Sequence, residues 1–418
     1  MPVPDTIAHM AAAARAAALQ LPAVPPHERS AALVHMAAAI RAGSATILAA
    51  NAVDLAAAAD TGLAPAMIDR LMLDEARVEA MAAGVEQVAG LPDPVGTVLE
   101  TRHHANGMRI EKVRVGLGVL AVIYESRPNV TADAAALALK AGNAVILRGG
   151  SEARHSTTAI HAAMAAAVES AGMPAAVVQL VPGTDRADVV RLVQMEGLVD
   201  LVIPRGGEGL IRAVTEHARV PVLKHYKGVC HVYVDAGADA AMAREIVVNA
   251  KCQRPGVCNA METLLVHADR ARDLLPELGS ALAEHDVVLR GDEVTCALVP
   301  GAQPATEDDW DREYLDLVAA VRVVDDLEQA IRHINTHGSG HSDVIVTADA
   351  SAAARFARDV DSATVYVNAS SRFTDGFEFG MGAEIGISTD KLHARGPCGV
   401  ESLTTYKYVI HGTGQVRR

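Results

Sequence analysis

A cysteine on a turn is the residue of this chain best suited to covalent chemistry. Cys258 follows a segment, 240–250, whose apolar residues are spaced as in a helix. Pro255 and Gly256 predict that this helix ends before Cys258 and that a tight turn follows. A thiol on such a turn is accessible to a substrate, and its thiolate attacks carbonyl carbon atoms. The sequence therefore predicts that Cys258 is a nucleophile.

The neighbours of Cys258 could help to ionise its thiol. At an ordinary pKa of about 8.5, only about 3% of a thiol is ionised at pH 7. Lys251 and Arg254 flank the cysteine, and a nearby helix N-terminus would add to their effect. Each unit by which the pKa falls favours the thiolate by about 1.4 kcal/mol. The alternative for any isolated cysteine is an inert, buried side chain.

Asn129 is a candidate partner of the thiol. It follows the apolar segment 119–124, in a turn that Pro128 fixes. A side-chain amide at this point could donate a hydrogen bond to the oxyanion that forms when a thiolate attacks a carbonyl. Removing one such donor raises the barrier by about 2.7–4 kcal/mol. The alternative is that Asn129 caps the helix that follows.

Long motifs across the chain resemble the gamma-glutamyl phosphate reductases (glutamate-5-semialdehyde dehydrogenases), a branch of the aldehyde dehydrogenase superfamily. Besides the Cys258 turn, they are residues 124–131, 147–152 and 393–397. The resemblance implies an α/β fold of the aldehyde dehydrogenase type, with two parallel-sheet αβα domains and a small β oligomerisation element. It also implies that Cys258 is catalytic, and that Asn129 and the Cys258 N–H stabilise the oxyanion.

The resemblance implies that the chain reduces L-glutamyl 5-phosphate to glutamate 5-semialdehyde through a Cys258 thioester, with NADPH, in proline biosynthesis. Ordinary aldehyde dehydrogenases have a glutamate that activates water to hydrolyse the thioester. The corresponding segment here, 222–228, has no carboxylate, which suits a thioester that hydride reduces. Its lysines and His225 favour anion binding, or form a solvent-facing basic cluster. The rival functions are an oxidative aldehyde dehydrogenase for a small acidic aldehyde and a non-catalytic dinucleotide-binding protein.

Turns that follow predicted strands are the candidate cofactor contacts. No GxGxxG motif lies at the start of a predicted helix. The similar sequence at residues 116–121 precedes a strand instead. By resemblance, Arg148 lies near the adenosine ribose, where its guanidinium could pair with a 2′-phosphate and favour NADPH. Without the family, Arg148 is equally a solvated charge at a strand end. The resemblance also implies that Glu313 holds the nicotinamide ribose. The other predicted cofactor contacts are Gly149, Gly150, Ser151, Gly183, Thr184, Gly206 and Gly207.

The guanidinium group of arginine can donate two parallel hydrogen bonds to a carboxylate or a phosphate, and the implied substrate has both groups. The candidates are Arg254, Arg372 and Arg395. No metal site is predicted. His337 and His341 flank a glycine-containing segment that would not hold them on one helix face, and the spacing of Cys252 and Cys258 fits no common zinc pattern.

The composition excludes some classes of protein. The chain has 418 residues, which predicts two or three domains. A net charge of −14 with 3% aromatic residues gives no support to nucleic-acid binding. Five scattered cysteines predict reduced thiols. No signal-peptide pattern and no apolar run of bilayer length stands out, so we expect a cytoplasmic protein without a membrane segment.

The elements that position these residues follow from periodicity. Residues 5–90 predict helices. From residue 118 strands alternate with helices, and the alternation restarts after 258, which predicts two parallel sheets that meet near residue 250. Cys258 would then lie at a domain boundary, where ligand clefts are common. Asn106 and Gly107 predict a hairpin turn between strands 98–103 and 109–115, a ribbon expected to pair with another element or subunit.

The sequence thus predicts three parts. They are an NADP-binding domain of residues 1–96 and 117–252, a catalytic domain of residues 253–383, and an oligomerisation element of residues 97–116 with 384–418. The resemblance implies a homo-oligomer of unspecified stoichiometry. It also allows functional coupling to a separate glutamate 5-kinase, which would supply the acyl phosphate.

Overall fold

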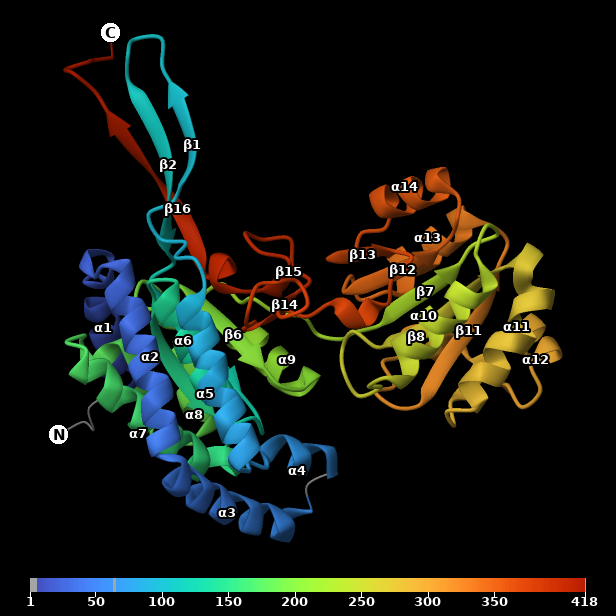
Figure 1. Cartoon of the computed structure of the whole chain (residues 1–418), viewed down its shortest axis with the longest axis horizontal. Coiled ribbons are helices and arrows are strands. Elements are labelled where there is room, and N and C mark those ends of the chain that lie inside the picture. Colours follow the sequence, from blue (N-terminus) through green and yellow to red (C-terminus); the bar gives the residue numbers. More distant parts are fainter. Residues whose placement is uncertain (1–5, 63–64, 418) are drawn as a thin grey trace. The chain divides into compact units, whose positions relative to one another are not determined.

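The computed structural model describes residues 6–62 and 65–417 (Figure 1). Residues 1–5, 63–64 and 418, which belong to the predicted N-terminal helical region and C-terminal tail, lie outside this description. The chain divides into two compact units. The first comprises Met1–Lys224, Gly380–Gly386 and Pro397–Arg418, and the second comprises His225–Phe379 and Ile387–Gly396.

This division differs from the boundary expected at residue 252. Residues 225–252 belong to the second unit, because β7 (Cys230–Val234) lies inside its sheet and α10 (Ala240–Cys252) packs on that sheet. The alternation of strands and helices did not reveal β7, because the residues directly before this strand, 222–229, are irregular.

The N-terminal region is helical, as the sequence predicts. Pro26 begins one helix, where its missing N–H costs nothing, and Gly62 ends another in the left-handed conformation with φ of 69°. The helices are α1 (Thr6–Ala18), α2 (Pro26–Ala42), α3 (Ser44–Thr61), α4 (Pro65–Leu71) and α5 (Glu75–Gly90). Within the described residues no single helix is long and apolar enough to span a membrane, although α2 and α3, bent by 65°, meet that criterion as a pair.

The first unit contains a parallel sheet with the strand order β5-β4-β3-β6. Its strands are β3 (Val119–Tyr124), β4 (Ala144–Gly149), β5 (Val178–Leu180) and β6 (Leu201–Arg205), and its helices are α6 (Val130–Lys140), α7 (Arg154–Ser170), α8 (Arg186–Leu192) and α9 (Glu208–His217). All of β3 is buried. Val119, Ala121 and Ile123 pack in a core with α1, and the intervening residues are buried on the other face. Burial on both faces explains the continuous apolar sequence.

The second unit contains a parallel sheet with the order β10-β9-β11-β8-β7-β12-β13. The remaining strands are β8 (Met261–His267), β9 (Val288–Gly291), β10 (Gln303–Pro304), β11 (Val318–Val324), β12 (Ser342–Val346) and β13 (Thr364–Val367). Helices α10 and α11 (Ala268–Ala283) pack on one face, and α13 (Leu327–His337) and α14 (Ala350–Asp359) pack on the other. Helix α12 (Glu293–Leu298) follows β9. Cys258 lies between α10 and β8, so its position is fixed by one helix and the central part of the sheet.

An antiparallel sheet of β1 (Val98–His103), β2 (Arg109–Gly116) and β16 (Thr404–His411) extends from the first unit (Figure 1). The turn between β1 and β2 contains Gly107 with φ of 90°, as the hairpin prediction requires. The element expected to pair with this ribbon is β16, which lies against β2. Nearly all of β1 and β16 is exposed. The C-terminal segment also contains the short strands β14 (Gly386–Ser388) and β15 (Gly396–Cys398).

Candidate active site

Cys258 lies in an irregular loop between α10 and β8, as its sequence predicts. Helix α10 ends at Cys252, before the Pro255 and Gly256 that interrupt it. The Cys258 side chain is half-buried. Its carbonyl oxygen accepts a hydrogen bond from the Cys230 thiol at 3.2 Å. A Cβ atom on Gly228 would lie 1.9 Å from the same oxygen. The loop is therefore held by β7 and by a close backbone approach that only glycine permits.

Lys251, which the sequence places near the Cys258 thiol, has a carboxylate partner of its own. Lys251 is fully buried and pairs with the buried carboxylate of Glu262, with Nζ 2.9 Å from Oε2. Burial raises the pKa of Glu262 to about 7, although the Lys251 ammonium and backbone N–H donors lower it in part. Moreover, Cys258 follows the C-terminal end of α10, and the next element is β8, so no helix N-terminus begins at the cysteine. Glu262 thus balances the charge of Lys251, and the chain itself begins no helix at Cys258.

Two of the three candidate arginines lie near Cys258. The Arg372 Nε donates to Gln253 Oε1 at 2.8 Å. Burial lowers the pKa of Arg372, the charge of Arg254 lowers it further, and Cys258 opposes this effect. Arg372 therefore lies near both the Arg254 guanidinium and the Cys258 sulfur. An anionic group of a substrate would relieve the repulsion between the two cations.

The third candidate, Arg395, is engaged elsewhere in the second unit. Its Nη1 donates to Asp361 Oδ1 and its Nη2 to the Asp361 carbonyl, both at 3.0 Å. With Lys391, Asn335 and Ser362, it lines a polar cavity of about 400 Å³. The sequence could not distinguish Arg395 from the other two arginines as a substrate contact, because all three lie in predicted loop regions.

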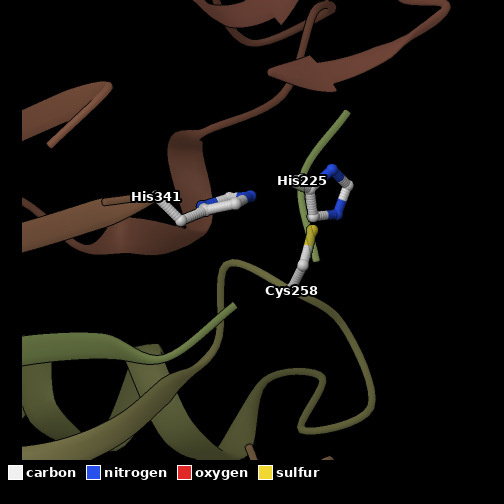
Figure 2. A group of neighbouring side chains, drawn as sticks. All are labelled: His225, Cys258 and His341. Atoms are coloured by element: carbon white, nitrogen blue, oxygen red, sulfur yellow. The ribbon is translucent and has the colours of Figure 1, made fainter. Parts of the chain in front are cut away.

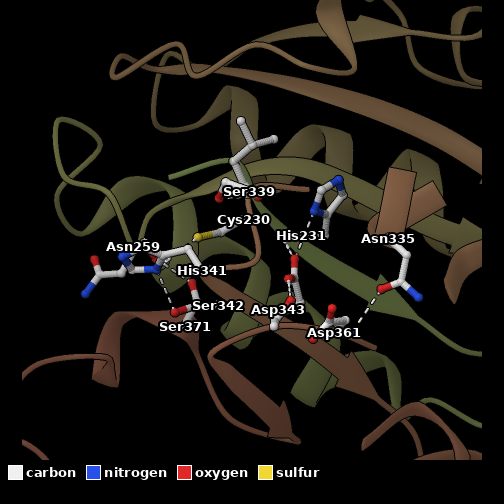
Figure 3. Close-up of polar contacts among 12 residues, drawn as sticks. Cys230, His231, Asn259, Asn335, Ser339, His341, Ser342, Asp343, Asp361 and Ser371 are labelled. Carbon is white, nitrogen blue, oxygen red and sulfur yellow. Dashed lines mark hydrogen bonds and ion pairs between the residues drawn. The ribbon is translucent and has the colours of Figure 1, made fainter. Parts of the chain in front are cut away.

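A loop after β13 is fixed to the residue that follows the cysteine (Figure 3). The Ser371 hydroxyl donates to the Asn259 carbonyl at 2.6 Å, and the Asn259 amide donates to the Thr374 carbonyl at 2.9 Å. Sequence reasoning missed Asn259. The only signal in the sequence was an amide directly after the candidate cysteine, since asparagine side chains often bond to backbone groups in loops.

Two histidines flank the sulfur (Figure 2). The Cys258 Sγ and one ring nitrogen each of His225 and His341 lie within 4.8 Å of one another. The two rings are in a T-shaped arrangement with centroids 5.5 Å apart. The sequence predicted that His337 and His341 would not share one helix face. The structure places His337 at the end of α13, where its Nδ1 lies 2.9 Å from Asp311 Oδ1.

Glu313 also belongs to the surroundings of Cys258. Its Oε1 accepts a hydrogen bond from the Gly228 N–H at 2.8 Å, and Gly228 lies against the Cys258 carbonyl. The carboxylate is only partly buried. The loop before β11 is therefore tied to the nucleophile loop by one carboxylate oxygen.

In the first unit, the predicted cofactor turns gather at one edge of the sheet, because parallel strands have their carboxyl ends together. Arg148, at the end of β4, joins two of these turns. Its Nη2 donates to the Thr184 carbonyl at 2.7 Å, and its Nη1 donates to the Gly149 carbonyl at 3.1 Å. Burial lowers the pKa of Arg148, and nearby carboxylates, first of all Glu152, oppose this. Arg148 therefore holds a loop in place, and neither predicted role describes it fully.

Glycines let acidic side chains fold back over these turns. A Cβ on Gly206 would lie 2.2 Å from Glu125 Oε2, and the Gly207 N–H donates to that oxygen at 3.0 Å. A Cβ on Gly150 would lie 2.3 Å from the Glu152 carboxylate, and one on Gly183 would lie 2.8 Å from an Asp188 oxygen. Narrow turns with bare backbone fit the phosphate and ribose groups of a dinucleotide. Exposed Ser151 begins a short 3₁₀ turn, one helix turn before α7.

Asn129 is exposed at the start of α6, in the same unit. Its side chain makes no capping hydrogen bond, so the alternative of a helix cap is wrong. The amide instead donates to Asp133 Oδ2 at 2.9 Å. Burial raises the pKa of the partly exposed Asp133 to about 6, while the Asn129 bond and the Arg205 charge lower it. A carboxylate thus orients one N–H of the Asn129 amide. The amide has a second N–H, which can donate to another acceptor.

Known proteins share both the sequence and the fold. The Aldehyde dehydrogenase family matches residues 4–298 and 310–383. The gamma-glutamyl phosphate reductase of Geobacter metallireducens is 53% identical over 418 residues, the full length of both chains. That of Moorella thermoacetica is 55% identical over 97% of each chain. The crystal structure of the Thermotoga maritima gamma-glutamyl phosphate reductase is 45% identical, covers 99% of this chain and 100% of its own, and superposes with a TM-score of 0.97.

The chain belongs to the aldehyde dehydrogenase family and, within it, to the gamma-glutamyl phosphate reductases. The α/β fold of the aldehyde dehydrogenase type is therefore confirmed.

Proposed function

We propose that this chain reduces L-glutamyl 5-phosphate to L-glutamate 5-semialdehyde and releases phosphate, using NADPH. One observation carries the proposal. A half-exposed cysteine lies in a fixed, irregular loop, in a chain more than 50% identical over its full length to proteins named for this activity. The reaction belongs to proline biosynthesis.

Cys258 forms the covalent bond. Its thiolate attacks the acyl carbon, an S–C bond forms, and the phosphate leaves with the electrons of the C–O bond. Acyl phosphate is an activated leaving group, so this step needs no general base. The Asn129 amide and the Cys258 N–H donate to the oxyanion, a stabilisation of about 2.7–4 kcal/mol for each donor in comparable sites. Arg254 and Arg372 hold the anionic groups of the substrate.

The turns at the sheet edge of the first unit bind the dinucleotide. They contain Gly149, Gly150, Ser151, Gly183, Thr184, Gly206 and Gly207. Glu313 accepts hydrogen bonds from the ribose hydroxyls. Bound NADPH supplies the hydride that reduces the acyl group on Cys258. The aldehyde then departs and the thiolate is restored.

The choice of NADPH depends on the charges around Arg148. Its guanidinium favours a 2′-phosphate, whereas the neighbouring carboxylates of Glu125, Glu152 and Asp188 favour a free ribose hydroxyl. Because two of the Arg148 nitrogens already bond to carbonyls, only the remaining donor capacity serves a phosphate. NADPH preference is thus the point of this proposal that most needs measurement.

We also propose that the β1-β2-β16 sheet joins copies of the chain in a homo-oligomer. It presents exposed Tyr406, Tyr408 and Ile410 along β16. Such an exposed strand offers unpaired backbone groups to a second copy. The substrate is supplied by a separate kinase that phosphorylates the side chain of glutamate.

The direct test uses the reaction in reverse. NADPH formation from NADP, glutamate 5-semialdehyde and phosphate is followed at 340 nm for the chain and for Cys258→Ala. We expect formation only when phosphate is present and only with Cys258. Formation without phosphate would identify an oxidative aldehyde dehydrogenase. Dinucleotide binding without turnover, unchanged in Cys258→Ala, would identify a non-catalytic protein.

A further inference from the structure

The side chains that converge on Cys258 form a ligand set for a metal ion. Two imidazoles and one thiol place one nitrogen, one nitrogen and one sulfur within 4.8 Å of one another (Figure 2). The three residues come from three separate segments, namely the one before β7, the loop after α10 and the residue directly before β12. Their spacing in the sequence fits no common zinc pattern, and only the folded second unit brings them together.

Hydrogen bonds orient both rings. The Nδ1 of His225 lies 2.9 Å from the Ile387 carbonyl oxygen, so it carries the proton, and Nε2 keeps its lone pair. The Nδ1 of His341 lies 2.9 Å from the Ser342 hydroxyl. That hydroxyl meets Thr374 Oγ1 at 2.7 Å. Metal-binding histidines are commonly oriented in this way, by a hydrogen bond between one ring nitrogen and a carbonyl or hydroxyl group.

We propose that His225, Cys258 and His341 bind a Zn²⁺ ion. A thiolate and two neutral imidazoles are zinc ligands, and three protein ligands leave a fourth position for water or an anion. In a bound tetrahedral site the ligand atoms would lie roughly 3.5 Å apart, which follows from Zn–S of about 2.3 Å and Zn–N of about 2.0 Å. The half-buried Cys258 and His225 side chains can rotate to close this gap, whereas His341 is buried and fixed.

The charges near the site limit its affinity. Arg372 lies near the sulfur and Arg254 lies near Arg372, so both cations oppose a dication, and no carboxylate belongs to this group of ligands. We therefore expect a reversible site with a dissociation constant between about 0.1 and 10 μM, weaker than structural four-ligand zinc sites. The two arginines also favour an anion at the fourth position of the metal, so phosphate should strengthen binding.

Zinc binding would prevent the Cys258 sulfur from acting as a nucleophile. The thiol releases its proton, and one sulfur lone pair forms the bond to the ion, so the sulfur no longer attacks an acyl carbon. Zn²⁺ and an acyl group thus exclude each other at Cys258. The binding itself does not depend on the proposed function, whereas the inhibition does.

The test measures binding first. The metal-free, reduced full chain is titrated with Zn²⁺ by calorimetry, and with Co²⁺, whose thiolate charge-transfer absorption reports a metal–sulfur bond. We expect one ion per chain. His225→Gln should weaken binding at least about tenfold, and Cys258→Ser should abolish the charge-transfer absorption. Cys252→Ser and His337→Gln, which alter a second thiol and a second histidine of the same unit, should bind as the unchanged chain does.

The inference fails if no binding occurs up to about 100 μM Zn²⁺, or if Cys258→Ser and His225→Gln bind as tightly as the two controls. The phosphate-dependent assay then separates the two proposals. Micromolar Zn²⁺ should inhibit the chain and the His337→Gln control equally, and a chelator should restore activity. A chain that binds Zn²⁺ without turnover would overturn the proposed function alone. An active chain that binds no Zn²⁺ would overturn this inference alone.

Discussion

The two units build their candidate sites in different ways. In the first unit, the residues lie in turns directly after β3, β4, β5 and β6, within a few positions of a strand end. In the second unit, the surroundings of Cys258 come from positions as distant as His225, His341 and Arg372. Local rules place the first set, because parallel strands end at one edge. The packing of β7, β8 and β12 places the second set.

This contrast predicts that substitutions in the second unit act on the chemical step, whereas those in the first act on cofactor binding or on a single hydrogen bond. The largest effect should come from Cys258→Ala, which removes the attacking atom. Turnover should fall about 10⁴-fold or more, because no other group can form the thioester. Binding of NADPH, measured by its fluorescence, should remain within twofold. If Cys258→Ala kept a tenth of the activity, the proposed mechanism would be contradicted.

Asn129→Ala tests the one residue of the first unit assigned to the chemical step. Loss of an oxyanion donor should lower kcat about 10²–10³-fold, with little change in KM. Thermal unfolding measures the structural contribution of the side chain, which should be small, since it caps no helix. A lowered melting temperature with unchanged kcat would assign Asn129 to stability alone.

Gly228→Ala should move the nucleophile loop without touching the sulfur. The new Cβ would lie 1.9 Å from the Cys258 carbonyl oxygen, so the loop must shift. A displacement near 1 Å costs about 10²-fold in activity. The matched control is Gly256→Ala in the same loop, where the nearest atom would be 3.7 Å away, and its activity should stay close to that of the unchanged chain. Equal effects of the two substitutions would show that Gly228 does not fix the loop.

Arg148→Lys tests the loop-holding role found in the first unit. A lysine cannot donate to both the Gly149 and Thr184 carbonyls as the guanidinium does. We expect KM for the dinucleotide to rise about tenfold, which is about 1.4 kcal/mol, for NADPH and NADH alike. A rise for NADPH alone would instead assign Arg148 to the 2′-phosphate.

The smallest effect should appear in the pH profile. The pKa of Asp133 is raised to about 6, so above this pH the carboxylate is ionised and accepts the Asn129 N–H strongly. Below pH 6 the carboxyl binds a proton and accepts more weakly, so kcat should fall a few-fold as the pH decreases. In Asp133→Asn this limb of the profile should be absent. Its persistence in that variant would assign the limb to another group.

Much of the fold could be predicted from the sequence. The apolar segment 119–124 is β3, and Asn106 and Gly107 form the predicted hairpin turn. The division between the units differs from the boundary at residue 252 because a long irregular segment, 218–229, separates β7 from α9, and alternation was the only signal used. The sequence also did not reveal the partner of Lys251. Its ammonium pairs with the buried carboxylate of Glu262, which lies on the following strand.

The candidate site could be predicted only in part. Cys258 and the glycine turns carry local signals, a Pro-Gly break and bare backbone at strand ends. His341, Cys230 and Gly228 carry none, since a histidine before a strand, a buried thiol and a loop glycine are common in any α/β protein. Among the arginines, chemistry gave three equal candidates, and the position of Asp361 separated Arg395 from the other two.

The sequence by itself determined the candidate nucleophile, the alternating elements and the turns that end parallel strands, because each depends on residues that are neighbours in the chain. Only the tertiary structure decided what surrounds the sulfur. Residues far apart in sequence meet there because β7 and β12 lie side by side in one sheet, and no local pattern records which strands become neighbours.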